Sequence, residues 1–374
     1  MSDLKVLIVG GGFAGMAAAI ELNRRGAAVE LLERDPDWRT DGAGISLHGA
    51  SLRVFKALGI YDDFLREGGC ANGFDILHPA TDQTITTLPT PVVGDVDFGG
   101  AGVMRPALAD MLRRKIRGTP VVTRLGGDFT AIEQDETGVT VRFDDGTSGR
   151  YDVLIGADGI ASRVRRTVMP DAPEPRYVGQ GVWRAVVDWP EELARPGMWS
   201  NGVIKIGINL VSKGKAYIFL TETRQTNEHI DPSTFVSRLS ALLRTMPSPV
   251  LNRIAGELGP ESQILYRPLF QLLVPRPWSE GRVVLIGDAI HATTPHLAAG
   301  ACAAMEDSIV LAEELTAEGT VKQALHRFED RRWERCRMIV ANSGRLCEIE
   351  MTGGDMQEHQ MLMRNSMQAL ALPI

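Results

Sequence analysis

The stretch GDAIHATTPHLAAGACAAMED, residues 287–307, carries the densest set of chemically active side chains in the sequence. Asp288, His291, His296 and Cys302 fall close together in it, and these residue types ligate zinc or act as general acids and bases. The same types also line cofactor sites. Which chemistry applies depends on the elements that position this stretch, so the rest of the chain has to be considered first.

The overall composition is that of a soluble globular protein. The chain has 374 residues, 44% of them hydrophobic and 23% charged, which is enough for two domains. A net charge of −7 gives no reason to expect nucleic acid as a partner. No apolar run reaches the roughly 18 residues of a membrane span. The scattered cysteines form no CxxC pair, which indicates reduced thiols. We expect a cytoplasmic α/β protein that is a monomer or a homodimer.

The N-terminal segment combines the elements of a dinucleotide-binding unit. LKVLIV (4–9) is a continuous apolar run typical of a buried parallel strand, and it leads into the glycine-rich GGGFAG (10–15). A segment with helical spacing follows, and then a second apolar run, AVELLE (28–33), that ends in an acid. Strand, GxGxxG turn, helix, strand and acid in this order predict that the chain binds a dinucleotide.

Each glycine of this fingerprint, and the acid after it, has a physical role. Gly10 permits a tight turn, Gly12 lets backbone N–H groups approach a pyrophosphate, and Gly15 lets helix and strand pack closely. The helix N-terminus adds partial positive charge for the phosphates. Glu33 is placed to accept hydrogen bonds from a ribose 2′-hydroxyl and would repel a 2′-phosphate. The predicted nucleotide is therefore the ADP half of FAD or NAD.

Two later segments have the form of further nucleotide-site motifs. In YDVLIGADGIASRVRR (151–166) an apolar run ends at Asp158, and in RVVLIGDAIH (282–291) another ends at Asp288. Both acids follow a buried strand at its carboxyl end, where ligands bind in open α/β sheets.

Taken together, the three motifs closely resemble those of the class A FAD-dependent aromatic monooxygenases, the para-hydroxybenzoate hydroxylase-like flavoproteins, over roughly residues 4–340. GADGIASRVR resembles the motif that this family associates with both FAD and the reduced nicotinamide. RVVLIGDAIH resembles the motif whose aspartate contacts the ribityl side of the flavin. Arg105 matches an arginine that heads a helix beside the flavin, and residues 38–59 resemble a glycine-rich loop and helix near its ring system.

The resemblance implies a site for FAD and no metal site, with His291 in a structural role. After Pro295 the family commonly has Gly-Gln-Gly where this chain has Ala298-Ala299-Gly300, so the ring's oxygen edge is expected to face backbone N–H groups at a helix start. The implied cofactor-binding residues are Gly10, Gly12, Phe13, Ala14, Gly15, Glu33, Arg34, Gly44, Arg105, Asp158, Arg165, Gly287, Asp288, Pro295, Ala298, Ala299, Gly300 and Ala301.

The predicted fold is α/β, with a Rossmann-like FAD/NAD(P)-binding domain, an inserted antiparallel-sheet substrate domain and C-terminal helices. Strand-like runs at 73–88 and 176–223 and helical spacing at 232–256 indicate the insertion. Long helices are expected from 299 and through 322–342. The predicted boundaries are 1–72, 100–175 and 275–350 for the FAD-binding domain, 73–99 and 176–274 for the substrate domain, and 351–374 for a C-terminal tail.

The resemblance also implies a reaction. NADH or NADPH reduces FAD, O2 adds at flavin C4a, and the hydroperoxide hydroxylates a small aromatic or heteroaromatic substrate such as a phenolic acid or a hydroxypyridine. Four residues are candidates for the substrate pocket: His48, Ser46, His296 and Tyr217. Each also has a simpler interpretation, as a solvent-facing loop residue or a packed strand residue.

Other side chains are expected to have no catalytic role. Glu306 and Asp307 are predicted to be ordinary helical carboxylates, Cys302 a packed core thiol and Arg163 a solvated cation. Arg184 is expected to pair with an acid, and the alternative is that it attracts an anionic substrate.

Other functions remain open at this level. They are a related flavoprotein that acts on a larger polycyclic or antibiotic-like substrate, a flavin-dependent reductase and a non-catalytic flavin-binding protein. A halogenase is disfavoured because we find no tryptophan-containing motif after the first fingerprint.

Overall fold

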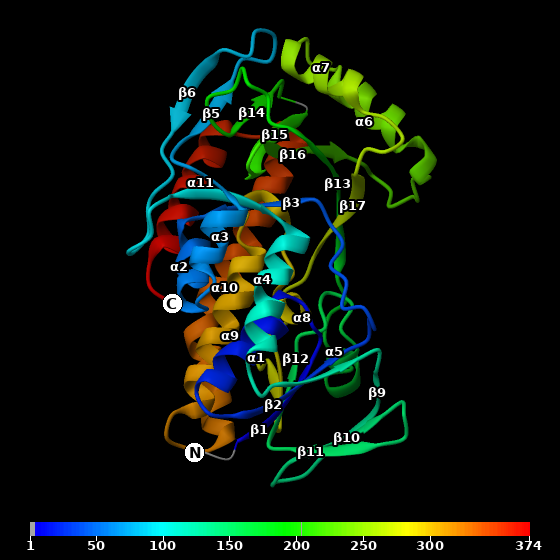
Figure 1. Cartoon of the computed structure of the whole chain (residues 1–374), viewed down its shortest axis with the longest axis vertical. Helices are drawn as coiled ribbons and strands as arrows, with labels where there is room; N and C mark the ends of the chain where they lie inside the picture. Colours follow the sequence, from blue (N-terminus) through cyan, green and yellow to red (C-terminus); the bar gives the residue numbers. More distant parts are fainter. Residues whose placement is uncertain (1–3, 203) are drawn as a thin grey trace.

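The computed structural model describes residues 4–202 and 204–374 (Figure 1), so residues 1–3 of the predicted first segment and residue 203 of a strand-like run lie outside it. Its lower half in Figure 1 is built on a six-stranded sheet whose pairings are parallel except for β18 with β19. In spatial order the strands are β18 (Ser279–Glu280), β19 (Val283–Leu285), β12 (Val153–Gly156), β1 (Lys5–Val9), β2 (Ala28–Glu33) and β8 (Val122–Leu125). This confirms the predicted Rossmann-like sheet.

Apolar strands explain the burial of this sheet on both faces. Val6, Leu7 and Ile8 of β1 have no exposed surface, as expected of a parallel strand covered on each side. Packed helices form one layer: α1 (Phe13–Arg24), α4 (Arg105–Arg117), α9 (Gly300–Thr316) and α10 (Val321–Thr352). A separate three-stranded meander contacts the sheet through β11, next to β1. Its strands are β9 (Phe129–Gln134), β10 (Val139–Phe143) and β11 (Ser148–Tyr151). The Tyr151 hydroxyl ties it to Glu30 of β2 at 2.7 Å. The sequence analysis did not predict the meander.

The upper half is a seven-stranded sheet, as the inserted strand-like runs predicted. All of its pairings are antiparallel except β14 with β5. In spatial order the strands are β17 (Ile264–Gln271), β13 (Arg176–Asp188), β16 (Lys215–Thr223), β15 (Lys205–Ser212), β14 (Gly197–Ser200), β5 (Phe74–Leu77) and β6 (Thr84–Leu88). One face packs an apolar core under η1 (Pro232–Thr234), α6 (Phe235–Leu243) and α7 (Pro249–Glu257). The opposite face is therefore directed at the rest of the molecule.

A small glycine-rich sheet joins the two halves. Its strands, in the order β3 (Gly44–His48), β7 (Gly100–Met104) and β4 (Gly69–Ala71), pack directly on β15. A Cβ atom at Gly69 or Gly102 would lie only 2.6 or 2.4 Å from Leu210 of β15. The absence of side chains at these two positions thus allows the two sheets to approach backbone to backbone.

This close approach makes Gly102 sensitive to substitution. We expect Gly102→Ala to lower the free energy of unfolding by about 1–3 kcal/mol, because the added methyl group meets the Leu210 carbonyl oxygen rather than a flexible side chain. Gly100→Ala in the same strand is the matched control, since its Cβ would lie no closer than 3.3 Å to its neighbours. Chemical denaturation measures both. Equal stability of the two variants would contradict the close sheet contact.

The C-terminal helices extend further than predicted. Helix α10 continues to Thr352 and ends at Gly353, which has the left-handed φ of +64° favoured by glycine after a helix. It passes the expected end at 342, and Gly344 lies in its interior, where a Cβ atom would meet the Gln271 side chain of β17. The predicted tail forms α11 (Met356–Ala371), which packs on α10 and on α2 (Gly49–Ala57), the helix before α3 (Tyr61–Glu67). The Arg335 guanidinium donates to the Leu370 carbonyl at 2.8 Å and so anchors the end of α11.

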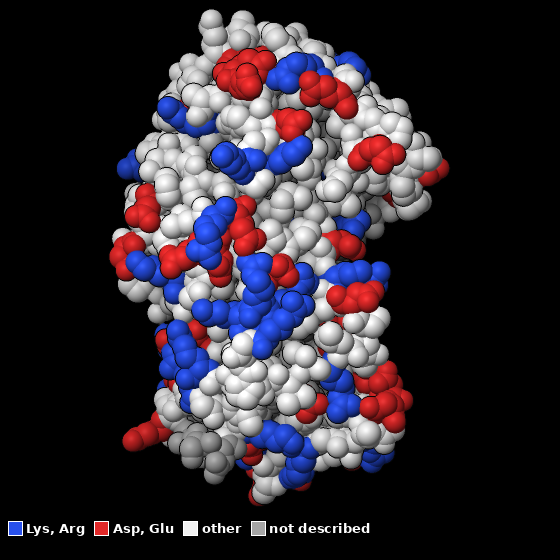
Figure 2. Space-filling model, in the orientation of Figure 1, with Lys and Arg blue, Asp and Glu red and all other residues white. Residues whose placement is uncertain are grey.

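The surface in Figure 2 shows acidic and basic side chains interspersed, with several Lys and Arg residues gathered near the middle of the view. Within residues 4–202 and 204–374, no helix combines the length and apolar character that crossing a membrane requires.

Candidate functional site

The three sequence motifs meet at one edge of the six-stranded sheet. Strands β19, β12 and β1 are parallel neighbours, so the turns that follow them emerge side by side. The Ile286 N–H donates to the Gly156 carbonyl at 3.0 Å, and a Cβ at Gly10 would lie 2.4 Å from the Ala157 carbonyl oxygen. Segments far apart in sequence thus form one continuous edge, in the position where open α/β sheets bind ligands.

The three fingerprint glycines differ in their surroundings. Gly10 has a φ of +109°, which disfavours any other residue. A Cβ at Gly15 would lie 1.9 Å from the Gly10 carbonyl oxygen, so α1 packs too closely on β1 for a side chain. Gly12 is exposed, and a Cβ there would meet no atom of the described residues within 4 Å. Two of these glycines are therefore required by the protein itself, whereas Gly12 faces open space at the start of α1. Phe13 and Ala14 follow it as the first residues of α1.

Glu33 lies directly beside the glycine turn. Its carboxylate accepts the Gly11 N–H at 2.7 Å and the Asp35 N–H at 2.8 Å. The buried Trp38 indole donates to the Gly11 carbonyl at 2.8 Å. Trp38 was not singled out in the sequence, because only the folded loop brings it to the turn. Arg34 is exposed next to Glu33.

Asp158 organises the turn after β12. Its carboxylate accepts the N–H groups of Arg163 at 2.7 Å and Val164 at 3.1 Å, at the N-terminus of α5 (Arg163–Val168). The Ser162 hydroxyl donates to the same carboxylate at 2.5 Å. Asp158 thus satisfies N–H groups that a helix start leaves free. The expected solvated cation Arg163 instead pairs with Asp128, although its side chain stays 45% exposed.

Arg165 connects the second motif to the third. Its side chain is buried, and it donates to the Ala289 carbonyl at 2.7 Å and the Ile160 carbonyl at 2.9 Å. Ala289 belongs to α8 (Asp288–His291), the short helix that begins at the third motif. Arg165 therefore holds two loops of the site together through backbone contacts.

Asp288 combines two properties expected of a side chain in a cleft. It is exposed to solvent, whereas its neighbours Gly287 and Ala289 are buried. The protein around it is nevertheless close enough that desolvation raises the pKa of its carboxyl, against the opposing effects of His291 and Arg105. Gly287 before it has a φ of +62°, which directs the chain into α8.

Arg105 heads α4 on the same side of the molecule. Its guanidinium lies 5.0 Å from the centre of the Phe13 ring. Its side chain also packs against Gly42, where a Cβ atom would lie 2.6 Å from Arg105 Cδ. Burial lowers the pKa of Arg105, and the nearby Arg184 of β13 lowers it further. Asp288, which follows β19, raises the same pKa. Since Arg105 is near residues of both sheets, it lies between the edge of the six-stranded sheet and the seven-stranded sheet.

The loop after α8 leads into a helix start. It contains η2 (Pro295–Leu297), then Ala298 with a left-handed φ of +50° and an N–H donated to the Pro295 carbonyl at 2.9 Å. An alanine in this conformation costs about 1 kcal/mol relative to glycine. Ala299 precedes α9, which begins with Gly300 and Ala301. The first N–H groups of α9 have no carbonyl partner one turn earlier, so this end of the helix presents donors.

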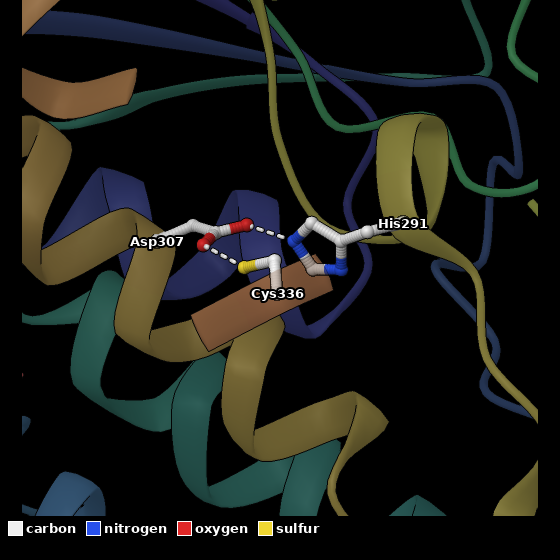
Figure 3. A group of neighbouring side chains, drawn as sticks. All are labelled: His291, Asp307 and Cys336. Atoms are coloured by element: carbon white, nitrogen blue, oxygen red, sulfur yellow. Dashed lines mark hydrogen bonds and ion pairs between the residues drawn. The ribbon is translucent and has the colours of Figure 1, made fainter. Parts of the chain in front are cut away.

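Figure 3 shows the nearest approach to a metal site in the described residues, formed by His291, Asp307 and Cys336 with their ligand atoms within 4.8 Å of one another. Both Asp307 oxygens already have partners. One oxygen contacts His291 Nε2 at 2.5 Å and accepts the Gly287 N–H at 2.9 Å, and the other accepts from Arg332 Nε at 2.8 Å. This arrangement is that of a buried charge network that also holds the turn before Asp288.

The expectation that Glu306 and Asp307 are ordinary helical carboxylates was therefore wrong. Both side chains are fully buried and share the fully buried Arg332 of α10, with Glu306 also paired to Arg335. Burial alone would raise the pKa of Asp307, but His291 and Arg332 outweigh burial and hold it at about 2. Burial alone would lower the pKa of His291, but Cys336 and Asp307 both act against burial and raise it. Cys302 is buried, as predicted for a core thiol.

Two of the four predicted pocket residues, Ser46 and Tyr217, lie where the small sheet meets the seven-stranded sheet, whereas His48, at the end of β3, has Glu306, Arg335 and Arg53 as its charged neighbours. Ser46 accepts from the Asn209 amide at 3.1 Å, and the buried Tyr217 packs against Gly44, with its ring 5.4 Å from that of Phe219. His48 Nε2 is buried and has no hydrogen-bond partner among the described residues. Burial lowers the pKa of His48 to about 4, so its ring is neutral at pH 7 and has an unused polar atom.

His296 lies in a different cluster. Its Nδ1 is 3.0 Å from the Thr294 hydroxyl and its Nε2 is 3.1 Å from Glu350 of α10. Nδ1 thus has a hydrogen-bond partner, whereas Nε2 and the facing Glu350 oxygen are in close polar contact without the alignment of a regular hydrogen bond. Glu350 was not identified from the sequence, because it lies at the end of a long helix with no motif around it.

Comparison with known proteins gives consistent matches. The family described as FAD binding domain matches residues 3–343. A 3-hydroxybenzoate 6-hydroxylase of Polaromonas naphthalenivorans is 33% identical over 93% of this chain and 88% of its own length, and the aurachin C monooxygenase/isomerase of Stigmatella aurantiaca is 32% identical over 93% and 90%. The crystal structure of Klebsiella pneumoniae HpxO complexed with FAD and uric acid superposes with a TM-score of 0.82 at 28% identity, covering 98% of this chain and 92% of that one.

Proposed function

Because this chain belongs to the FAD-binding family of aromatic monooxygenases, we propose that it uses NADH or NADPH and O2 to hydroxylate a small aromatic or heteroaromatic compound. The observation that carries the proposal is the meeting of the three motif turns at adjacent ends of β19, β12 and β1. When bound, FAD supplies the redox chemistry, accepting hydride from the nicotinamide and activating dioxygen. The protein supplies binding, orientation and exclusion of water.

The residues at this edge fit FAD. The open space at Gly12 beside the start of α1 suits a pyrophosphate, and Glu33 beside the turn suits a ribose hydroxyl. Asp288 is exposed among buried residues and suits the ribityl chain. The N–H groups at the start of α9, after Pro295 and Ala298, would face the oxygen edge of the flavin ring. Asp158 and Arg165 act by holding the loops that form the site.

The face of the seven-stranded sheet supports an aromatic substrate. Tyr217 and Phe219 are stacked with an interplanar angle of 27°, and Arg184 pairs across the strands with Phe219 on the same face. Arg184 is close enough to Arg105 to lower the pKa of Arg105. An anionic group near the two guanidinium groups would relieve their like-charge repulsion. A phosphate of the cofactor or the carboxylate of an aromatic acid could supply it.

The proposal is tested by screening aromatic acids and hydroxypyridines for stimulated consumption of NADH and of NADPH, with the product mass checked for one added oxygen atom. We expect one compound class to give both results. Stimulation without the mass gain would contradict the assigned reaction, and turnover without O2 would favour a flavin-dependent reductase. A response confined to larger polycyclic or antibiotic-like compounds would correct the substrate class.

Asp288→Asn tests the cofactor site separately from turnover. We expect the FAD affinity of the apoprotein to fall by about tenfold, because the amide cannot accept hydrogen bonds as strongly as the carboxylate. The apoprotein should be no less stable, because the raised pKa of Asp288 means that folding disfavours its charged form. Quenching of flavin fluorescence and thermal unfolding measure the two effects. Asp188→Asn, at an exposed carboxylate 2.6 Å from Lys215, is the matched control and should change neither.

A further inference from the structure

Glu350 joins three separate elements through one carboxylate. It contacts His296 of η2 at 3.1 Å, His359 of α11 at 3.2 Å and the ammonium group of Lys205 on β15. The His296 side chain is 1% exposed, and those of Glu350, His359 and Lys205 are 13%, 14% and 17% exposed. Glu350 and His359 lie beyond the family match at residues 3–343, whereas His296 and Lys205 lie within it.

The charges in this cluster assign the hydrogen positions. Burial alone would raise the pKa of Glu350, but Lys205 and the two histidines outweigh it and hold that pKa well below its usual range. Burial lowers the pKa of His296, which keeps its ring neutral. An ionised carboxylate attracts a proton on the ring nitrogen that faces it, so the 3.1 Å contact with Glu350 favours the proton on Nε2, although the two atoms lack the alignment of a regular hydrogen bond. Nδ1 is then free to accept from the Thr294 hydroxyl at 3.0 Å.

His296 therefore has a hydrogen bond at one ring nitrogen and a close contact with a carboxylate at the other. It lies between Pro295 and Leu297, directly before the left-handed Ala298 that turns the chain into α9. Movement of His296 would therefore displace the loop backbone and, with it, the N–H groups at the start of α9.

We propose that Glu350 is a positioning residue that acts through His296 to fix residues 294–299, and so aligns the helix-start N–H groups with the oxygen edge of the flavin ring. This inference rests on the proposed function, which puts the ring at that loop. The negative charge gained at this edge when the flavin is reduced is then stabilised by well-aligned donors. Glu350 thereby favours the reduced cofactor.

Glu350→Gln in the FAD-loaded protein is the principal test. We expect the midpoint potential of the bound flavin to become more negative, its visible circular dichroism to change and the dissociation constant for FAD to rise several-fold. Thr294→Val, which removes the hydroxyl at the other end of the same ring, should shift the potential in the same direction and serves if Glu350→Gln does not fold. An unchanged potential in either folded variant overturns the inference.

Two further variants separate positioning from charge balance. His359→Gln removes a partner of Glu350 that belongs to α11 rather than to the loop, and the potential of this variant should equal that of the wild type. Lys205→Met combined with Glu350→Gln removes both members of the ion pair and should keep the shift. Recovery of the wild-type potential in the double variant would mean that Glu350 only neutralises Lys205. Wild-type protein that binds no FAD would instead contradict the proposed function.

Discussion

Replacing Gly12 with alanine is expected to leave the apoprotein folded while lowering its affinity for FAD by at least about tenfold, or ~1.4 kcal/mol. A Cβ at Gly12 enters open space in the protein, where the pyrophosphate of the cofactor is proposed to lie. Gly12 caps α1, where alanine is a poorer residue than glycine, but alanine also loses less backbone entropy on folding. These effects oppose one another, so the stability of the apoprotein should change by less than about 1 kcal/mol. Titration of apoprotein with FAD and thermal unfolding without it are the measurements.

Gly15→Ala gives the contrasting result within the same motif. Its Cβ would lie 1.9 Å from the Gly10 carbonyl oxygen, so the apoprotein itself should lose about 1–3 kcal/mol of stability or more. Gly256→Ala, in α7 and also with no described atom within 4 Å of its Cβ, controls for an added methyl group and should not affect FAD binding. Unchanged FAD affinity in Gly12→Ala would mean that the phosphates do not pass this turn.

Replacing Arg332 with methionine is expected to destabilise the protein by about 3–5 kcal/mol, because it leaves Glu306 and Asp307 as buried carboxylates without their shared guanidinium. Arg331→Met is the neighbouring control. Arg331 pairs with Glu313 and Glu314 at the surface and should contribute no more than about 1 kcal/mol. Urea denaturation of both variants at pH 7 measures the difference. Equal losses would show that burial adds nothing to the Arg332 pairs.

The same network predicts how stability changes with acidity. The pKa of Asp307 in the folded protein, about 2, lies below its ordinary value, so its contribution is fully present above about pH 4 and is lost as the pH falls toward 2. Without Arg332 the pKa of Asp307 rises, and the corresponding loss of stability should begin at a higher pH. Denaturation curves between pH 7 and pH 3 would reveal this displacement.

The sequence predicted those parts of the site that depend on short-range patterns. The roles of Gly10 and Gly15 follow from a turn between a strand and a helix, and both positions in the structure leave no room for a side chain. The convergence of Asp158 and Asp288 follows from the rule that parallel strands present their carboxyl ends at one edge. The longer strands of the upper sheet were also recognisable, because they form runs rich in apolar residues.

Contacts between distant segments were not predictable in the same way. In the sequence, Arg332 cannot be distinguished from the other arginines of its helix. It is buried against two acids only because α10 packs on α9. Trp38 and Glu350 likewise gain their roles from loops and helices that meet in three dimensions. The left-handed conformation of Ala298 is unexpected for alanine and is set by its surroundings rather than by its own preference.

The order in which the strands are used has a consequence for how this protein can be divided. The chain leaves the six-stranded sheet after β2, returns to it at β8, leaves again after β12 and returns at β18. No contiguous fragment therefore contains all strands of either half without strands of the other. Neither half can be cut out, exchanged with that of a relative by a single crossover, or released intact by one proteolytic cleavage. The edge of the six-stranded sheet where the motif turns meet and the sheet face that carries Tyr217 and Phe219 are therefore built from interleaved segments of one chain.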